Sequence, residues 1–149
     1  MKHKPDSPAE LKARALRHLM RREHSRAELA RKLAPHAESS EALAALLDLL
    51  LSKKHQSDER FAEERARVLS RKFGAARIRQ DLRARGVADE VIQRVSSDGE
   101  LERARQILER KYRAPAATRE ERAKRMRFLQ GRGFSYEIIT RLLSSREAE

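Results

Sequence analysis

Apolar residues recur every three or four positions along most of this chain, separated by charged and polar residues. This spacing is the period of an amphipathic α-helix with one buried face. No run alternates cleanly between apolar and polar residues, so no β-strand is predicted. Pro and Gly interrupt the pattern at a few points and divide it into short helices. The sequence therefore predicts an all-α fold, with breaks at Pro35, Gly74, Gly86, Gly99, Pro115, Gly131 and Gly133.

Two segments that begin 47 residues apart, 82–95 and 129–142, repeat one pattern. Both contain a Leu, an Arg-Gly pair, a Glu, an Ile and an Arg at equivalent positions, and their other apolar positions also match. Each segment is predicted to form a helix end, a tight turn and a new helix. Gly86 and Gly133 then fall just past a helix C-terminus, where a left-handed backbone favours Gly.

Extending this pattern towards the N-terminus gives three copies of a three-helix unit. The expected organisation is a flexible N-terminus at 1–9, followed by helical repeats at 10–55, 56–98 and 99–149. Each repeat buries too little surface to be very stable alone, so neighbours are expected to stack end to end. We therefore expect three tandem three-helix repeats in an elongated, curved modular arrangement rather than a globular ball of nine helices.

The first copy of the unit is the most divergent. Its first helix is expected to present Leu16, Leu19 and Met20 as an apolar face. Ser25 is expected to cap the second helix, with Glu28 three residues later completing a capping box. These assignments predict that the N-terminal third of the chain forms its own small leucine core.

Charge is the second clear property of the chain. Its 149 residues include 35 Lys or Arg and 23 Asp or Glu, so the formal net charge is +12. Arg accounts for 26 of the 35 basic residues, and its planar guanidinium pairs well with phosphate and carboxylate groups. A helix face that is merely solvated usually carries acidic residues for i to i+4 pairing as well. The excess of Arg therefore favours polyanions or acidic protein surfaces as partners.

The basic residues are densest in the second repeat. Residues 65–85 include eight basic residues and one acid, Asp81, which gives +7 over 21 residues. Arg79 and Arg83 lie four positions apart and share a face of the predicted helix, and a second basic stretch follows at 103–132. We predict that these segments bind a phosphate-rich or acidic partner. The candidate binding residues are Arg71, Lys72, Arg77, Arg79, Arg83, Arg85, Arg125, Arg127 and Arg132.

Residue types that catalysis or metal binding would need are missing or scattered. The chain has no Cys, which excludes disulfides and thiolate metal sites and is compatible with a reducing compartment. Its five His show no metal-ligand spacing, and His18 and His24 are expected at the surface. Aromatic residues make up 4% of the chain, with no Trp, so no stacking platform is expected. We predict no enzyme activity, no catalytic residue, no cofactor and no metal.

No segment resembles a membrane span. The longest apolar stretch, 42–51, is interrupted by Asp48 and is far shorter than the roughly 20 residues that a span needs. Residues 1–11 contain no apolar run of the kind found in signal peptides. We therefore expect a cytoplasmic protein that does not bind membranes. Because no long heptad pattern is present, we also expect a monomer.

A second interpretation is a DNA-binding protein. Segment 16–33 is predicted to form a helix, a short turn at Ser25 and another helix, like half of a DNA-reading helix-turn-helix. Its second helix is short and lacks the Asn and Gln that read adenine edges, and its turn lacks Gly. Sequence-specific reading of DNA is therefore not favoured. A basic helical protein that binds duplex DNA, or a purely structural helical scaffold, stays open as an alternative.

Several segments together resemble the RecX regulatory proteins. The middle of the chain carries Asp58-Glu-Arg-Phe-Ala62, then Gly74-Ala-Ala-Arg-Ile-Arg-Gln-Asp-Leu-Arg-Ala-Arg-Gly86, then Glu90-Val-Ile. The segment from Lys124 to Ile139 is similar to the C-terminal part of that family, and Ala15 to Leu33 resembles its N-terminal unit. The resemblance covers nearly all of the chain from about residue 10.

This resemblance implies three tandem three-helix repeats in a curved protein. It also implies binding to the RecA recombinase, in the helical groove of the filament that RecA forms on single-stranded DNA. The expected consequence is inhibition of the recombinase ATPase, strand exchange and coprotease activity, and so regulation of DNA repair and the SOS response. Single-stranded DNA would be reached through the filament, with weak direct DNA binding. The alternative is a basic helical protein that acts on duplex DNA without RecA.

Overall fold

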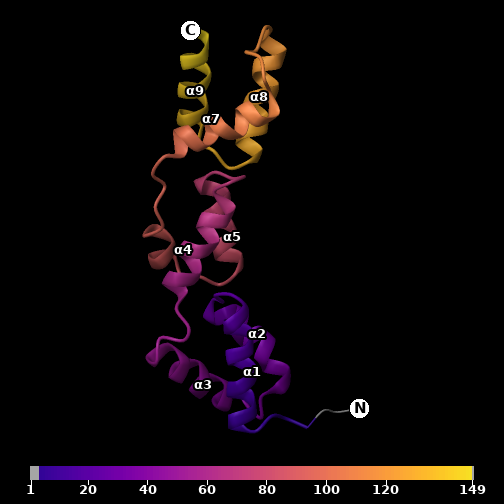
Figure 1. The fold of residues 1–149 in the computed structure, drawn as a ribbon, viewed down its shortest axis with the longest axis vertical. Helices are drawn as coiled ribbons and strands as arrows, with labels where there is room; N and C mark the ends of the chain where they lie inside the picture. The colour runs from indigo at the N-terminus through magenta and orange to yellow at the C-terminus, as the bar shows by residue number, and fades with distance from the viewer. Residues whose placement is uncertain (1–3, 149) are drawn as a thin grey trace. The chain divides into compact units, whose positions relative to one another are not determined.

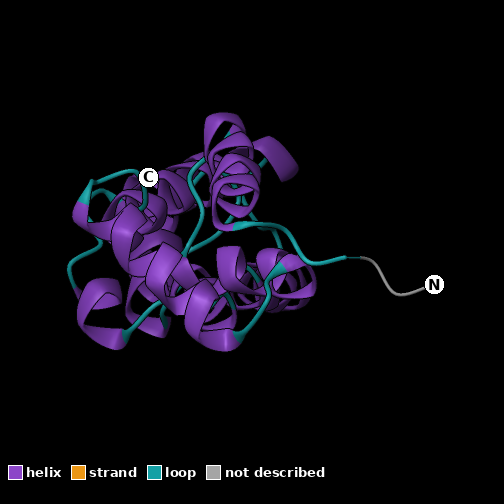
Figure 2. Ribbon diagram, turned by 90° about the horizontal axis from the view of Figure 1, so that it is seen from below, coloured by secondary structure: helices purple, strands orange, loops and turns teal. Residues whose placement is uncertain are grey.

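The computed structural model describes residues 4–148, with side chains for residues 4–144. These residues contain helices and loops and no strand (Figure 2), so the predicted all-α fold is confirmed. The elements, labelled in Figure 1 where space allows, are α1 (Pro8–Arg21), α2 (Arg26–Leu33), the 3₁₀ helix η1 (Ala34–His36), α3 (Ser40–Ser52), α4 (Asp58–Leu69), α5 (Ala75–Ala84), α6 (Asp89–Gln93), α7 (Glu100–Lys111), α8 (Arg119–Gly131) and α9 (Tyr136–Ala148).

The chain divides into two compact units. The first unit contains the described residues up to Glu64 together with Leu82–Arg94, and the second contains Arg65–Asp81 and the described residues from Val95 onward. Helices α4 and α5 contribute residues to both units. Each unit therefore combines one outer group of three helices with part of the middle group.

In the first unit, α1, α2 and α3 enclose a small core of Leu and Ala side chains. The predicted capping box of α2 is confirmed, because the Ser25 hydroxyl accepts from the Glu28 amide while the Glu28 carboxylate accepts from the Ser25 amide. Ser7 and Glu10 form the same box at α1. The buried residues of this core are Leu11, Ala15, Leu29, Leu33, Leu46, Leu47 and Leu50.

Helix α1 differs from the prediction in two respects. Met20 is 86% exposed, because the buried face passes through Leu11 and Ala15 and the 100° step per residue turns position 20 away from it. The helix also begins at Pro8, inside the segment 1–9 that was expected to be flexible. The Ser7 cap and an ion pair between Asp6 and Arg14 at 2.8 Å hold this segment, and its first three residues lie outside the described residues.

In the second unit, α7, α8 and α9 pack together around a second core (Figure 1). The Thr118 hydroxyl caps α8 by accepting from the Glu121 amide at 3.1 Å. Tyr112, Met126 and Phe128 pack against the edge of this core and are partly exposed. The buried residues are Ala104, Ile107, Leu108, Leu129, Phe134, Ile139, Leu142 and Leu143.

The first Arg-Gly turn packs against the start of a helix from the preceding repeat. Gly86 has a φ of +83°, which confirms the predicted left-handed conformation. The Ser25 hydroxyl donates to the carbonyl oxygen of Arg85 at 2.7 Å, and a Cβ on Gly86 would lie 2.3 Å from the Cβ of Ala27. The turn therefore needs Gly for its backbone conformation and for its contact with α2.

The second Arg-Gly turn makes the equivalent contact in the second unit. Gly133 has a φ of +94°, and the Gly74 amide donates to the carbonyl oxygen of Arg132 at 2.7 Å. A Cβ on Gly133 would lie 2.4 Å from the Cβ of Arg77, near the start of α5. The sequence repeat thus marks the place where one repeat docks on the one before it, and this docking brings together the residues described next.

Candidate functional site

The second unit contains a basic groove with a volume of about 260 Å³. We use this name for the surface formed by its lining residues. Five of the seven described lining residues are Lys or Arg, and none is acidic. The lining residues are Arg71, Lys72, Ile107, Arg110, Lys111, Phe128 and Arg132.

Three chain segments supply these cations, and all three lie at or just beyond the end of a helix. Arg71 and Lys72 follow the end of α4 at Leu69, Arg110 and Lys111 form the last two residues of α7, and Arg132 follows α8. Basic residues at this end of a helix interact favourably with its dipole. The C-terminal ends of three helices therefore meet at the groove, and basic residues lie at each of these ends.

Aromatic rings lie between the cations of the groove. The guanidinium carbon of Arg132 lies 5.6 Å from the ring centre of Phe73 and 5.1 Å from that of Phe128. The Lys111 ammonium lies 4.5 Å from the ring centre of Phe128, and the Arg77 guanidinium lies 4.8 Å from that of Phe73. Such cation–π contacts are worth roughly 0.5–1 kcal/mol each at exposed sites. The rings therefore position cations at the groove, although aromatic residues make up only 4% of the chain.

Hydrogen bonds to backbone carbonyls also position two of these guanidinium groups. Arg132 donates from Nη1 to the carbonyl oxygen of Lys72 at 3.3 Å, and Arg77 donates from Nη1 to that of Gly131 at 3.1 Å. A side chain held in this way loses less conformational entropy when it binds an anion than a freely rotating one does. The groove is therefore partly organised before any ligand arrives.

The electrostatics of the groove favour anions with more than one charged oxygen. No ion pair among the described residues involves Arg71, Lys72, Arg110, Lys111 or Arg132. Close, unneutralised cations raise the local concentration of a polyanion and strengthen its binding at low ionic strength. The arrangement can hold phosphate or carboxylate groups.

Some candidate residues from the sequence come together here and others do not. Arg71, Lys72 and Arg132 line the groove, and Arg77 lies beside it against Phe73. The remaining exposed candidates do not line it; they are Arg79, Arg83 and Arg127. Of these, Arg83 forms an ion pair with Asp89 at 3.0 Å in which both partners are largely exposed, and such a pair contributes little to stability.

Two further candidate residues, one buried and one half-buried, make contacts within the fold. Arg125 is only 6% exposed, and its guanidinium lies 4.6 Å from the ring centre of Tyr112. Arg85 donates to the Glu28 carboxylate at 2.7 Å, and its carbonyl oxygen accepts from Ser25. We assign both residues to packing, because the tertiary structure encloses Arg125 and uses Arg85 to join two repeats.

Sequence reasoning missed five residues that line or adjoin the groove, although the sequence carries a signal for four of them. The tripeptides Arg71-Lys72-Phe73 and Arg110-Lys111-Tyr112 have the same basic-basic-aromatic pattern. The first tripeptide follows the end of α4 and the second spans the end of α7, so both lie at the end of the first helix of a repeat. A search for repeats by residue type, beyond the Arg-Gly turn, finds them. The missed residues are Phe73, Arg110, Lys111, Tyr112 and Phe128.

His24 in the first unit was also predicted wrongly, since it is 1% exposed rather than at the surface. Its Nδ1 lies 3.0 Å from the carbonyl oxygen of Arg22, and its Nε2 lies 2.9 Å from Nζ of Lys32. A carbonyl can only accept, so Nδ1 carries the proton and Nε2 accepts from the ammonium. Burial lowers the pKa of His24, and the nearby cations lower it further. The imidazole is therefore neutral in the folded chain.

Glu28 anchors the same region of the first unit. Burial raises the pKa of its carboxyl, but hydrogen bonds from Arg22, Ser25 and Arg85 outweigh this effect, and the net pKa is lowered. The Gln56 side-chain amide donates to the backbone carbonyl oxygen of His24 at 3.3 Å. These contacts belong to the packing of repeats and not to the basic groove.

Two other kinds of site are absent from the described residues. Residues 4–144, whose side chains are described, contain no group of three or more His, Cys, Asp or Glu placed to hold a metal ion. Within the same residues, no helix has both the length and the apolar character that crossing a bilayer requires.

Comparison with known proteins identifies the family. The model of the second three-helix domain of RecX matches residues 57–95, and the model of the third matches residues 98–143. The regulatory protein RecX of Herbaspirillum seropedicae is 48% identical over 138 residues, which is 91% of this chain and 90% of the relative. The chain belongs to the RecX family.

Further RecX proteins agree with this result. RecX of Ralstonia nicotianae is 43% identical over 147 residues, covering 97% of this chain and 92% of the relative. The crystal structure of RecX from Lactobacillus salivarius has the same fold, with a TM-score of 0.85 and 19% identity over 95% of this chain and 97% of that one. The relatives are named as regulatory proteins, which is not the name of an enzyme family.

The RecX domain matches place the groove within the repeat structure. The lining residues Arg71 and Lys72 lie in the second RecX domain, whereas the other lining residues lie in the third. The groove is therefore made where two consecutive RecX domains dock through the turn at Gly133.

Proposed function

We propose that this RecX-family chain regulates the RecA recombinase. It binds the filament of RecA on single-stranded DNA in the helical groove of that filament. By doing so it inhibits the ATPase, strand exchange and coprotease activity of RecA, and thereby regulates DNA repair and the SOS response. The observation that carries this proposal is the basic groove, in which five cations and no acid meet on a member of a regulatory family.

In this proposal the basic groove contacts phosphate groups of the DNA held by the filament. Aromatic rings lie between its cations, and the cations already cover the faces of these rings. The rings therefore hold the positive charges in position and leave little surface on which a base could stack. Contacts of this type carry no sequence information. The expected binding therefore does not depend on base sequence, as suits a regulator of a filament that assembles on any strand.

Inhibition requires that the chain prefer one state of the filament. A ligand that binds two states equally shifts neither. A contact that spans recombinase and DNA exists only in the assembled filament, so its free energy favours the bound, inactive arrangement. Direct binding to free single-stranded DNA uses the phosphate contacts alone and is expected to be weaker.

The test measures the DNA-stimulated ATPase of RecA while this chain is titrated in below one molecule per RecA. Wild type is expected to inhibit. The double variant Arg71→Gln and Arg110→Gln removes two exposed cations of the groove, and it should require roughly tenfold more protein for half-inhibition, because each lost phosphate contact weakens binding.

A matched control separates the groove from net charge. The double variant Lys124→Gln and Arg127→Gln removes the same charge from exposed positions of the same unit outside the groove, and it should inhibit nearly as well as wild type. If wild type leaves the ATPase unchanged while binding bare duplex DNA tightly, the chain is the alternative, a basic helical DNA-binding protein that acts without RecA.

A further inference from the structure

Lys32 and His24 form a hydrogen-bonded pair in the first unit, away from the residues of the basic groove. Nζ of Lys32, in the last turn of α2, lies 2.9 Å from Nε2 of His24. The imidazole is buried, whereas Lys32 is exposed. The pair therefore joins an amine that dissolved molecules can reach to a ring that the fold holds in place.

The backbone fixes the orientation of the His24 ring. Its Nδ1 donates to the carbonyl oxygen of Arg22 at 3.0 Å, so the lone pair of Nε2 points at Lys32. A nucleophile, a base and a group that orients the base, each within hydrogen-bond reach of the next, form the usual arrangement of an activated nucleophile. Lys32, His24 and the Arg22 carbonyl oxygen have this arrangement.

Lys32 lacks the acidic partner that its position in α2 would normally provide. Glu28 lies four residues earlier, where a Glu usually pairs with a Lys. Its carboxylate instead accepts from Arg22 at 3.2 Å and from Arg85 at 2.7 Å. No ion pair among the described residues involves Lys32. Partial desolvation of the amine and then the charge of Arg22 lower the pKa of Lys32, and they outweigh the opposite effect of Glu28.

The charges near this pair favour an anionic reactant. Arg21 and Arg22, at the end of α1, are exposed, and the charges of both act on the Lys32 amine. Positive charge around a group raises the local concentration of anions. An acyl phosphate combines an anionic phosphate with an activated carbonyl carbon. It therefore suits both the charge of this surface and the amine at its centre.

We propose that Lys32 is a site of covalent modification, at which acyl phosphates acylate the amine with His24 as the base. The neutral Nζ attacks the carbonyl carbon and forms the C–N bond. The C–O bond to the phosphate breaks, and inorganic phosphate leaves with the electron pair. Nε2 of His24 accepts the proton that the nitrogen loses and then releases it to water. One positive charge moves from nitrogen to the ring in this step, so two cations are never in contact.

The product keeps the hydrogen bond that joins the pair. An amide N–H at Lys32 is still a donor for Nε2 of His24, so the packing of the ring does not depend on the positive charge of the amine. Acylation removes that charge from the first unit, whereas the cations of the basic groove belong to the second unit and are unchanged.

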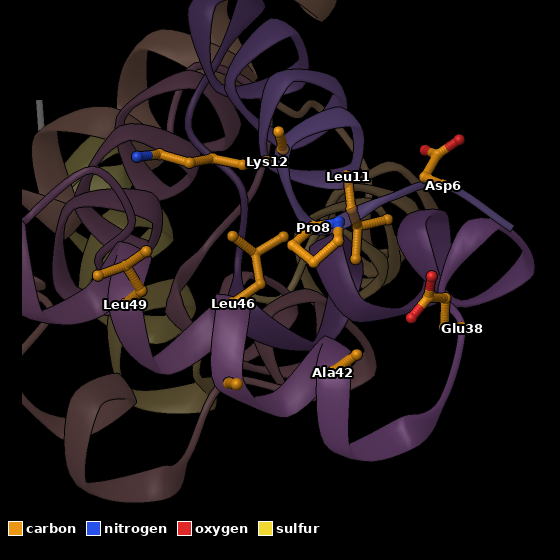
Figure 3. A pocket seen from close by; sticks show the side chains of 10 residues that line it. Asp6, Pro8, Leu11, Lys12, Glu38, Ala42, Leu46 and Leu49 are labelled. Atoms are coloured by element: carbon orange, nitrogen blue, oxygen red, sulfur yellow. The ribbon is translucent and has the colours of Figure 1, made fainter.

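The experiment incubates the purified full-length chain with acetyl phosphate and measures the initial acetylation rate of each lysine by peptide mass spectrometry. Two lysines of the first unit are the references. Lys12 lines an apolar groove of about 380 Å³, and Figure 3 shows its amine extending away from Asp6 and Glu38. Lys53 is exposed at the end of α3. Among the described residues, neither reference donates a hydrogen bond to a histidine.

Lys32 is expected to react about tenfold or more faster than either reference, a part of the about 10²–10⁴-fold that a positioned base supplies in enzymes. His24→Gln offers Lys32 an amide oxygen that accepts a hydrogen bond but takes no proton, and it should reduce the Lys32 rate to that of the references. His55→Gln removes an exposed histidine of the same unit and should leave the Lys32 rate unchanged. Circular dichroism establishes that both variants remain helical.

Wild type in urea provides a second test if His24→Gln fails to fold. The pair exists only in the folded chain, so the three lysines should react at equal rates once the chain is unfolded. Equal rates in the folded chain would overturn the proposal. So would a fast Lys32 in folded His24→Gln, or a fast Lys32 that persists in urea, because exposure or local sequence would then be the cause. The assay contains no recombinase, so its outcome is independent of the proposed function.

Discussion

The imidazole of His24 is held between a backbone carbonyl and an ammonium group. Nδ1 donates to Arg22, and Nε2 accepts from Lys32 at 2.9 Å. His18 faces the ring with its own imidazole at a centroid distance of 5.7 Å, and Glu28 is the nearest acid with an effect on it. A proton on Nε2 would remove the acceptor for Lys32 and place two cations in contact. The folded state therefore resists protonation, as the lowered pKa of His24 indicates.

The free energy of unfolding should therefore decrease as the pH falls. Below the ordinary His pKa of 6.5, the unfolded chain binds a proton that the folded chain rejects, so stability falls until the pH passes the lowered pKa of the folded state. Urea unfolding between pH 8 and pH 5, followed by circular dichroism, measures this slope. His24→Gln should reduce it, and the remainder belongs to His18, whose pKa is also lowered by burial.

The range stops at pH 5 because Glu28, whose pKa is lowered, contributes stability that is lost only when its carboxylate is protonated at lower pH. A slope that His24→Gln leaves unchanged would contradict the role assigned to this residue.

At the scale of elements, the Arg-Gly turn is the part of the fold with the strictest sequence requirement. Gly133 has a φ of +94°, and a Cβ there would lie 2.4 Å from the Cβ of Arg77 and 2.6 Å from its backbone nitrogen. Gly133→Ala therefore combines backbone strain with a clash, and it should cost more than about 2 kcal/mol of unfolding free energy. Urea unfolding of the full-length variant gives this value.

Gly131, two residues earlier, is the matched control. It lies at the end of α8, and a Cβ there would have nothing within 4 Å. Gly131→Ala should be neutral or stabilise the chain by up to about 1 kcal/mol, because Ala is the better helix former. If both variants lost the same stability, the docking contact at Gly133 would not be the cause.

At this scale, some features of the fold could be predicted from the sequence and others could not. The repeat spacing predicted the helices and the left-handed turns at Gly86 and Gly133, and the Glu three residues after Ser25 predicted the capping box there, because each feature depends on nearby residues. The burial of Arg125 and His24 depends on which helices meet, and no local pattern encodes that. A basic residue is thus recognised from sequence, but its place in a surface or in a core is not.

The basic groove also depends on which helices meet and not on a local sequence pattern. Its residues come from three helix ends that are far apart in the sequence, and only the docking of one repeat on the next brings them together. Charge density alone selected Arg71, Lys72 and Arg132, which line the groove, and it selected Arg127 as well, which does not. The density of basic residues along the chain shows how many cations a segment carries, but it does not show where cations from different segments come together.

At the scale of the whole molecule, the question is whether polyanion binding depends on the total charge of +12 or on its local arrangement. These two explanations predict different effects of salt on binding to a single-stranded oligonucleotide. Each phosphate that a protein neutralises contributes about −0.7 to the slope of log K against log salt for single strands. Charge that acts only from a distance is largely screened beyond about 10 Å at 0.1 M salt.

Fluorescence anisotropy over a range of NaCl concentrations measures this slope. Arg71→Gln with Arg110→Gln should reduce its magnitude by about 1.4, since two phosphate contacts are lost. Lys124→Gln with Arg127→Gln has the same net charge and should leave the slope near that of wild type, because neither residue lines the groove. Equal reductions in the two double variants would mean that total charge governs binding. A reduction confined to the first would assign the bound phosphates to the groove formed by the Arg-Lys-aromatic segments.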